Sequence, residues 1–180
     1  MTDTTAALLV VDVQRDVMAE SINSDAVIGN VRTLVDRARE RSVPVIWVRH
    51  NADQELVLGS DGWQIVSELD PGEEPVVDKR YGDAFADTDL EDQLRQVGAQ
   101  EVVLCGAQTD ACIRSTFYGG LYRGYPMTLV ADAHTTGDLR QWGAEYAPEQ
   151  VISMLNLHAD NTVLPGVRGS VTTTADALGG

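Results

Sequence analysis

The two cysteines of the chain lie in the segment VVLCGAQTDACIRSTFYGG and are suited to different roles. Cys105 ends an apolar run, so we expect an inert core residue there. Cys112 falls in the first turn of a predicted helix over about 109–123, with Thr109 or Asp110 as its N-cap. Helix N-termini and nearby cations lower the pKa of a thiol, and the thiolate is the nucleophile. The sequence therefore favours Cys112 for chemistry, the alternative being a small apolar residue on the buried face of the helix.

Asp12 and Lys79 supply the other groups that an acyl-transfer site needs. Asp12 follows the apolar run LLVV, and Lys79 ends the segment PVVDK. A carboxylate at Asp12 can take the thiol proton, and an ammonium at Lys79 can stabilise the thiolate. Backbone N–H groups at the start of a helix can bind the oxyanion of an acyl intermediate. Taken singly, Asp12 is equally a loop cap and Lys79 a solvated lysine, but the three residues together predict nucleophilic catalysis.

His134, which also follows a predicted strand, offers a second way to activate Cys112. Pairing with histidine is the commoner means of activating a cysteine, so the residues alone leave both arrangements open. Aromatic and polar side chains near other strand ends are candidates for the wall of a small-molecule site. These substrate-binding candidates are Gln14, His50, Trp63, Tyr81, Phe117 and Tyr118. Phe117 and Tyr118 share the predicted helix of Cys112, where a core position is the alternative.

Short apolar runs alternate with helical periodicity along the chain, and these elements must position the candidate residues. The apolar runs predict strands over 6–13, 43–49, 75–79, 101–105 and 127–132, with a short last strand in 161–166. Helices are predicted over about 25–41, from Thr88 with a Thr88–Glu91 capping box, over 109–123 and over about 148–159. Strands without polar alternation, separated by helices, indicate an α/β fold with a parallel sheet covered on both faces. Ligands bind beyond the carboxyl ends of such strands.

The composition fits one domain over residues 1–180, with a loosely held, Gly- and Thr-rich tail at about 168–180. The 28 acidic residues against 13 Lys and Arg give a formal charge of -15, which disfavours nucleic acid and anionic membranes as partners. The N-terminal apolar run is too short for a signal peptide or a membrane span, so we expect a cytoplasmic protein. A reducing compartment argues against a disulfide. The three histidines are scattered and predict no metal site with the cysteines.

Three segments, taken together and in this order, resemble the isochorismatase-like cysteine hydrolases. ALLVVDVQRDV is similar to the opening strand of that family with its catalytic Asp, here Asp12. VVDKRYGDAFADTDLEDQL is similar to the family's lysine segment, with Lys79 in the place of the lysine. EVVLCGAQTDACIRSTFYGGLYRGYPMTLVADAHTT resembles the segment that holds the family's cysteine, here Cys112. The match runs over roughly residues 6–165, nearly the whole chain.

The resemblance implies a three-layer α/β/α, Rossmann-like fold around a roughly six-stranded parallel sheet, with an Asp12–Lys79–Cys112 triad. Members of the family attack an amide or related C–N bond, release ammonia or an amine, and hydrolyse the resulting thioester. A non-proline cis peptide bond between Ala107 and Gln108 is also implied, with the N–H groups of Gln108 and Cys112 directed at the oxyanion. Many relatives are dimers or tetramers, so the resemblance implies a homo-oligomer.

The chain departs from the family pattern in two places. Val17 stands where relatives commonly have a pocket-lining Phe, which leaves the shape of the substrate open. Metal-binding members have an Asp and two His after the second strand, whereas this chain has WVRHNADQEL, so we expect no metal and no other cofactor. The longer stretch RHNADQELVLGSDGWQIVSEL is more similar to the branch that includes streptothricin-hydrolase-like enzymes.

The expected activity is thus metal-independent hydrolysis of a C–N bond in a small amide, lactam or ureido compound. Two alternatives stay open. One is hydrolysis of a vinyl ether of the isochorismate type, with Asp12 as the acid and Cys112 incidental. The other is a non-catalytic, ligand-binding or redox-sensing member of the fold, in which Cys112 is oxidised rather than acylated.

Overall fold

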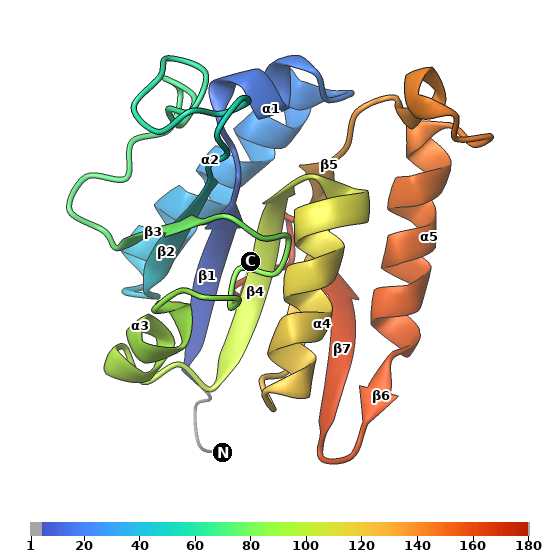
Figure 1. Ribbon diagram of the computed structural model, residues 1–180. Coiled ribbons are helices and arrows are strands. Elements are labelled where there is room, and N and C mark those ends of the chain that lie inside the picture. Colours follow the sequence, from blue (N-terminus) through green and yellow to red (C-terminus); the bar gives the residue numbers. More distant parts are fainter. Residues whose placement is uncertain (1–4, 180) are drawn as a thin grey trace.

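A computed structural model describes residues 5–179 and has a central sheet of seven strands (Figure 1). The strand order is β3-β2-β1-β4-β5-β7-β6, and each neighbouring pair is parallel except β6 with β7. The strands are β1 (Ala6–Val11), β2 (Val45–His50), β3 (Val76–Lys79), β4 (Glu101–Ala107), β5 (Met127–Thr135), β6 (Val163–Leu164) and β7 (Val167–Thr172). The predicted parallel sheet of about six strands is confirmed, and the short β6 adds an antiparallel strand at one edge.

Helices cover both faces of the sheet, as a parallel sheet requires (Figure 1). The α-helices are α1 (Arg15–Ala19), α2 (Ser24–Glu40), α3 (Leu90–Gln96), α4 (Arg114–Tyr122) and α5 (Pro148–Asn161). Two other helical turns are η1 (Thr109–Ile113), which is π-helical, and η2 (Leu139–Trp142), which is a 3-10 turn. No helix within residues 5–179 combines the length and the apolar composition needed to cross a membrane.

The strand β1 shows how one apolar run serves two cores. Leu8 and Val10 pack in the cluster that includes the buried face of α2, whereas Leu9 and Val11 pack in the cluster formed with α3, α4 and α5. Successive side chains of a strand point to opposite faces, so a strand buried on both faces needs an unbroken apolar run. The three-layer α/β/α arrangement expected from the sequence is therefore confirmed.

The predicted capping box at Thr88 is wrong. The helix α3 begins at Leu90, and the Thr88 hydroxyl donates to the Ala84 carbonyl oxygen at 2.6 Å. Glu91 does not reach back to the start of the helix but pairs with Arg95, one turn further along, at 2.5 Å. The sequence pattern was misleading because Glu91 has a cation available at i+4, and this pairing competes with capping.

The C-terminal segment is part of the fold rather than loosely held. Residues Val167–Thr172 form β7, which runs parallel to β5 within the sheet. Beyond it, the N–H and the hydroxyl of Thr174 both donate to Asp132 Oδ1, at 2.7 and 2.8 Å, and Ala177 is buried against the α2 face. Threonine is β-branched and suits a strand as well as a loop, which explains the wrong prediction. Residues 1–4 and 180 of the expected domain lie outside the described residues.

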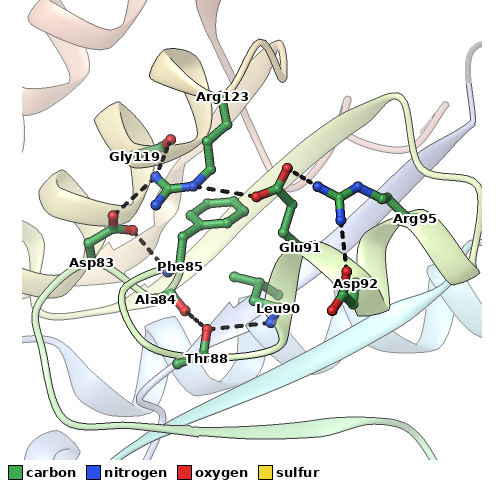
Figure 2. Close-up of polar contacts among 10 residues, drawn as sticks. All are labelled: Asp83, Ala84, Phe85, Thr88, Leu90, Glu91, Asp92, Arg95, Gly119 and Arg123. Atoms are coloured by element: carbon green, nitrogen blue, oxygen red, sulfur yellow. Dashed lines mark hydrogen bonds and ion pairs between the residues drawn. The ribbon is translucent and has the colours of Figure 1, made fainter.

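Polar contacts fasten the segment that follows β3 to α4 (Figure 2). The guanidinium of Arg123 donates to the Asp83 carboxylate at 3.3 Å and to the Gly119 carbonyl oxygen at 2.9 Å. It also lies 4.8 Å from the centre of the Phe85 ring and 3.8 Å from the Glu91 carboxylate. Because α4 follows directly on η1, these contacts help to hold η1 and the end of β3 in a fixed relation.

Candidate active site

The candidate site lies at the carboxyl ends of the strands, where the order of the sheet reverses. β2 and β3 extend the sheet on one side of β1, whereas β4 and the later strands extend it on the other side. Such a switch point leaves a crevice in which ligands bind. Asp12 follows β1 directly, and Gln108 and Cys112 follow β4. The topology therefore brings the predicted acid and the predicted nucleophile to one crevice.

The backbone is tightly packed at the two strand ends. Gly106 has a φ of 121°, and a Cβ there would lie 1.9 Å from the Val11 carbonyl oxygen, so glycine is required. The peptide bond between Ala107 and Gln108 is cis. Asp12 has a φ of 53°, a left-handed conformation that is uncommon for residues other than glycine. A left-handed conformation such as that of Asp12 occurs often at functional sites.

The Lys79 ammonium is the centre of a polar cluster that it forms with Asp12, His50 and Cys112. Its Nζ lies 2.8 Å from Asp12 Oδ2, 3.0 Å from His50 Nδ1 and 3.1 Å from Cys112 Sγ. The side chains of Lys79 and Asp12 are 0% and 3% exposed, so this ion pair is shielded from water. Burial alone would lower the pKa of Lys79, but Asp12 and Cys112 outweigh that effect and the pKa is raised. Lys79 therefore stays charged at neutral pH.

Asp12 has one carboxylate oxygen available to accept a proton. Oδ2 is paired with Lys79, whereas Oδ1 is buried and has no hydrogen-bond partner among residues 5–179. A buried acceptor without a partner is costly, so it calls for a functional explanation. One Asp12 oxygen, one His50 ring nitrogen and Cys112 Sγ lie within 4.8 Å of one another. The Asp12 carboxylate and the Cys112 thiol are thus near enough for a small adjustment to bring them into hydrogen-bond contact.

The Cys112 thiol is protonated at rest, which contradicts the expectation of a lowered pKa. Burial raises the pKa of Cys112 to about 12, and the Asp12 carboxylate adds to the rise, while Lys79 opposes it. A thiol in this state needs a base at the moment of attack. Cys105 is fully buried in β4, as predicted, and burial raises its pKa as well. Of the two thiols, Cys112 alone has a base and a cation beside it within the described chain.

The turn that carries Cys112 is π-helical rather than the start of an α-helix. In η1 the Gln108 carbonyl oxygen accepts from the N–H groups of Ala111 and Ile113, each at 3.1 Å. A π-helical turn is wider than an α-helical one and is frequent at functional sites. The helix predicted over 109–123 is therefore present, but its first turn has a different form.

His134 anchors this turn and is not placed to activate the thiol. Its Nδ1 shares a hydrogen bond with the Thr109 hydroxyl at 2.8 Å, and its Nε2 shares one with Asn156 Oδ1 at 2.9 Å. With both ring nitrogens engaged, the Cys–His alternative loses its support. The Asp110 carboxylate accepts from the Thr136 hydroxyl. Thr109 thus binds a side chain of β5, and Asp110 binds one just after that strand. Neither provides the predicted N-cap.

Gln14 is a structural residue rather than a wall of the site. Its buried side chain donates through Nε2 to the carbonyl oxygens of His50 and Trp63, at 2.9 and 2.8 Å. Its Oε1 accepts from the His50 N–H at 2.8 Å. These bonds fix the backbone at the end of β2, and hence the imidazole that contacts Lys79. Burial, followed by the charge of Lys79, lowers the pKa of His50, so the ring is neutral at neutral pH.

The four aromatic candidates lie outside the lining of the site. Phe117 is wholly buried in the core, and Tyr118 packs edge-on against it with ring centres 5.5 Å apart. The Trp63 ring is buried beneath the guanidinium of Arg49, 3.7 Å from its centre. Tyr81 points into solvent. Strand-end position predicted nearness to the crevice, but the direction of each side chain depends on packing that the sequence pattern does not reveal.

A cleft of about 830 Å³ opens over the polar cluster, and its size suits a small molecule. Asp12, Cys112, His50 and Gln108 line it, as the sequence predicts. Further lining residues come from α1 with its C-cap residue, from the loop between β2 and β3, and from η2: Asp16, Val17, Ala19, Glu20, Gln54, Glu55, Leu56, Val57, Ser60 and Trp142. Apart from Val17, the sequence pattern does not point to these residues, because the loop is irregular and α1 and η2 are too short to give a periodic signal.

Asp12, His50 and Cys112 are residue types that bind metal ions, but the lysine occupies their centre. Nζ of Lys79 is within 3.1 Å of an atom of each of the three. A divalent cation in the same place would meet a buried ammonium, which is strongly unfavourable. The donor set therefore fits the lysine rather than a metal ion.

Comparison with known proteins agrees with this geometry. Residues 6–151 match the model of the Isochorismatase domain. A streptothricin hydrolase from Streptomyces noursei is 35% identical over 139 residues, which are 74% of this chain and 55% of that enzyme, so the chain spans about half of its length. Nicotinamidase 3 from Arabidopsis thaliana is 29% identical over 148 residues, 73% of each protein.

A solved structure agrees in fold as well. An isochorismatase from Pseudomonas putida KT2440 superposes with a TM-score of 0.85 at 27% identity, covering 96% of this chain and 89% of that one. The family model covers more than three quarters of the chain, including all three residues of the predicted triad. The chain therefore belongs to the isochorismatase family of hydrolases.

Proposed function

We propose that this protein is a cysteine hydrolase that cleaves a C–N bond of a small amide, lactam or ureido compound without a metal ion. The observation that carries the proposal is the Asp12 carboxylate, with its free Oδ1, near a protonated Cys112 thiol, and with Lys79 hydrogen-bonded to both residues. A nucleophile, a base and an orienting cation within reach of one another are the parts that covalent catalysis requires. A nicotinamidase among the relatives supports amide hydrolysis.

In the proposed reaction, Asp12 Oδ1 accepts the Cys112 proton as Sγ attacks the carbonyl carbon of the substrate. A carbon–sulfur bond forms, and the carbonyl oxygen takes up the electron pair. The intermediate then collapses, the C–N bond breaks, and Asp12 returns its proton to the leaving nitrogen. Asp12 next takes a proton from water, which hydrolyses the thioester and regenerates the thiol.

Lys79 acts on Asp12 and Cys112 through its charge and does not itself give up or take a proton. Its ammonium favours the ionised form of Asp12 and of Cys112, so it lowers the cost of the charge-separated steps. His50 accepts the third hydrogen bond of the Lys79 ammonium, which leaves the other two N–H groups directed at Asp12 and Cys112. We place the oxyanion hole at the N–H groups of Gln108 and Cys112, because both residues line the cleft at a helical turn.

A screen of small primary amides, lactams and ureido compounds tests the proposal. We expect ammonia or amine release from at least one compound, and loss of that activity after treatment with iodoacetamide. Isochorismate serves as the second arm of the screen. Pyruvate release from isochorismate that is insensitive to iodoacetamide, with no amide turned over, would contradict the proposal and select ether hydrolysis.

A further inference from the structure

The mouth of the cleft carries three carboxylates that no cation of the described chain neutralises. Asp16 belongs to α1, Glu20 is its C-cap, and Glu55 lies in the loop between β2 and β3. None of the three forms an ion pair with any of residues 5–179. Arg15, the adjacent cation in the sequence, pairs with Asp61 instead.

The floor of the cleft adds no net positive charge to balance this mouth. The Lys79 ammonium is paired with the Asp12 carboxylate at 2.8 Å, so together they are neutral. His50 is neutral as well, because its ring sits in a partly buried place beside that ammonium. Asp12 also lines the cleft, and its buried Oδ1 has no partner within residues 5–179. The cleft is thus negative at the mouth and offers a free buried acceptor at the bottom.

An indole ring stands at the same mouth. Trp142 of η2 lines the cleft and is 81% exposed, a large apolar surface to leave in water. The face of a tryptophan ring is the best aromatic partner for an ammonium or guanidinium group. Carboxylates and an exposed indole together form the chemistry that recognises a small organic cation.

We propose that the substrate is an amide that carries an ammonium group. The cation would lie between Trp142 and the carboxylates of Asp16, Glu20 and Glu55, while the amide carbon reaches Cys112. This inference rests on the proposed function and deepens it, since it names the class of amide. It also makes a prediction about the cleft that does not depend on turnover.

The electrostatic part is tested with three thiol reagents that differ in charge. Trimethylammonium-ethyl, methyl and sulfonatoethyl methanethiosulfonates modify Cys112, and intact mass with peptide mapping follows the rate. After division by the rates for N-acetylcysteine, we expect the cationic reagent to react about tenfold faster than the anionic one, or more. The ratio should fall at about 0.5 M salt, because the screening length is then only a few ångströms. A normalised ratio of one or less in the wild-type protein would overturn the proposal.

Charge variants assign the effect to the mouth of the cleft. In the triple variant Asp16→Asn, Glu20→Gln, Glu55→Gln, the normalised ratio should fall toward one. The control removes three exposed carboxylates elsewhere, Asp36→Asn, Glu40→Gln and Asp160→Asn, on α2 and α5. Equal losses in the two triple variants would overturn the assignment, because only the total charge would then matter.

Turnover provides the second arm. We expect 6-aminohexanamide to have a kcat/KM about tenfold above that of heptanamide, its uncharged analogue. This preference for the charged amide should be several-fold smaller in Trp142→Ala than in Trp142→Phe, which keeps an aromatic ring. Equal turnover of the two amides would overturn the cation preference and leave the proposed function intact. A high reagent ratio with no amide hydrolysed would support the charged cleft and contradict the proposed function.

Discussion

The floor and the mouth of the cleft are built in opposite ways. At the floor, one ammonium holds Asp12, His50 and Cys112 within 3.1 Å, and the Lys79–Asp12 pair is shielded from water. At the mouth, exposed carboxylates stand without partners among the described residues, beside a largely exposed Trp142. The floor is fixed by hydrogen bonds among the ends of β1, β2 and β3 and the turn η1, whereas the mouth belongs to a loop and short helices.

This contrast in burial and pairing indicates different roles for the two parts. Charges that are buried and paired interact strongly, so removing one partner of such a pair has a large effect. Charges in water are screened, and each contributes little by itself. We therefore assign the chemistry to the floor and the choice of substrate to the mouth. Substitutions should separate the two parts by the size of their effects.

The largest effect is expected from the nucleophile. Cys112→Ala should lower kcat by about 10³-fold or more while the protein stays folded, because no other thiol of residues 5–179 lines the cleft to form the acyl intermediate. Ammonia release from a substrate found in the screen measures this. Cys105→Ala is the matched control, since that thiol lies in the core of β4, and it should retain turnover. Retained turnover in Cys112→Ala would falsify the assignment.

The base comes next. Asp12→Asn should lower kcat by about 10²–10⁴-fold, because general-base transfer from a thiol that is protonated at rest is then lost. Steady-state kinetics measure the effect, and circular dichroism confirms folding. Asp36→Asn, an exposed carboxylate on α2, is the control for loss of one negative charge. An Asp12→Asn variant in which only KM changes, with kcat as in the wild-type protein, would contradict the role of base.

The buried pair also stabilises the fold in a way that the mouth does not. Lys79→Met should lower the free energy of unfolding by about 3–5 kcal/mol, because it leaves the Asp12 carboxylate buried without its cation. Urea denaturation measures the change. The double variant Asp12→Asn, Lys79→Met should lose less than Lys79→Met alone. A double variant no more stable than the single one would show that the charge of Asp12 is not what the lysine compensates.

A change of pH tests the protonation state of the Cys112 thiol without altering the chain. Since burial, followed by Asp12, raises the pKa of Cys112 to about 12, the thiolate fraction increases with pH up to that value. The rate of alkylation of Cys112 by iodoacetamide should thus rise about tenfold per pH unit between roughly pH 7 and 10, without a plateau. Peptide mapping separates it from Cys105, which should stay unlabelled. A plateau below about pH 9 would mean that Lys79 outweighs burial.

Sequence patterns predict the frame of this molecule well, for a physical reason. The apolar run of β1 is unbroken because both faces of the sheet are covered, and this requirement indicates the parallel fold directly. The ends of parallel strands share one edge, so Asp12, Lys79 and Cys112 follow from the positions of three runs. The family resemblance agrees and fixes their order.

Other features depend on contacts between segments, and these are not periodic. The position of Gln14 just after β1 predicts a pocket residue, but its amide satisfies backbone groups of His50 and Trp63. The position of Cys112 at a helix start predicts a lowered thiol pKa, but burial at the bottom of the cleft raises it, and a sequence pattern does not reveal that burial. The predicted homo-oligomer and cytoplasmic location stay predictions, which light scattering and cell fractionation would test.

The proposed mechanism requires that Cys112 becomes acylated during turnover. Acid quenching of the protein with a substrate amide, followed by peptide mass spectrometry, tests this most directly. We expect an added acyl group on the peptide that contains Cys112, absent in Cys112→Ala and removed on further incubation before the quench. Continued release of ammonia with no adduct on Cys112, or an adduct on another residue, would contradict it.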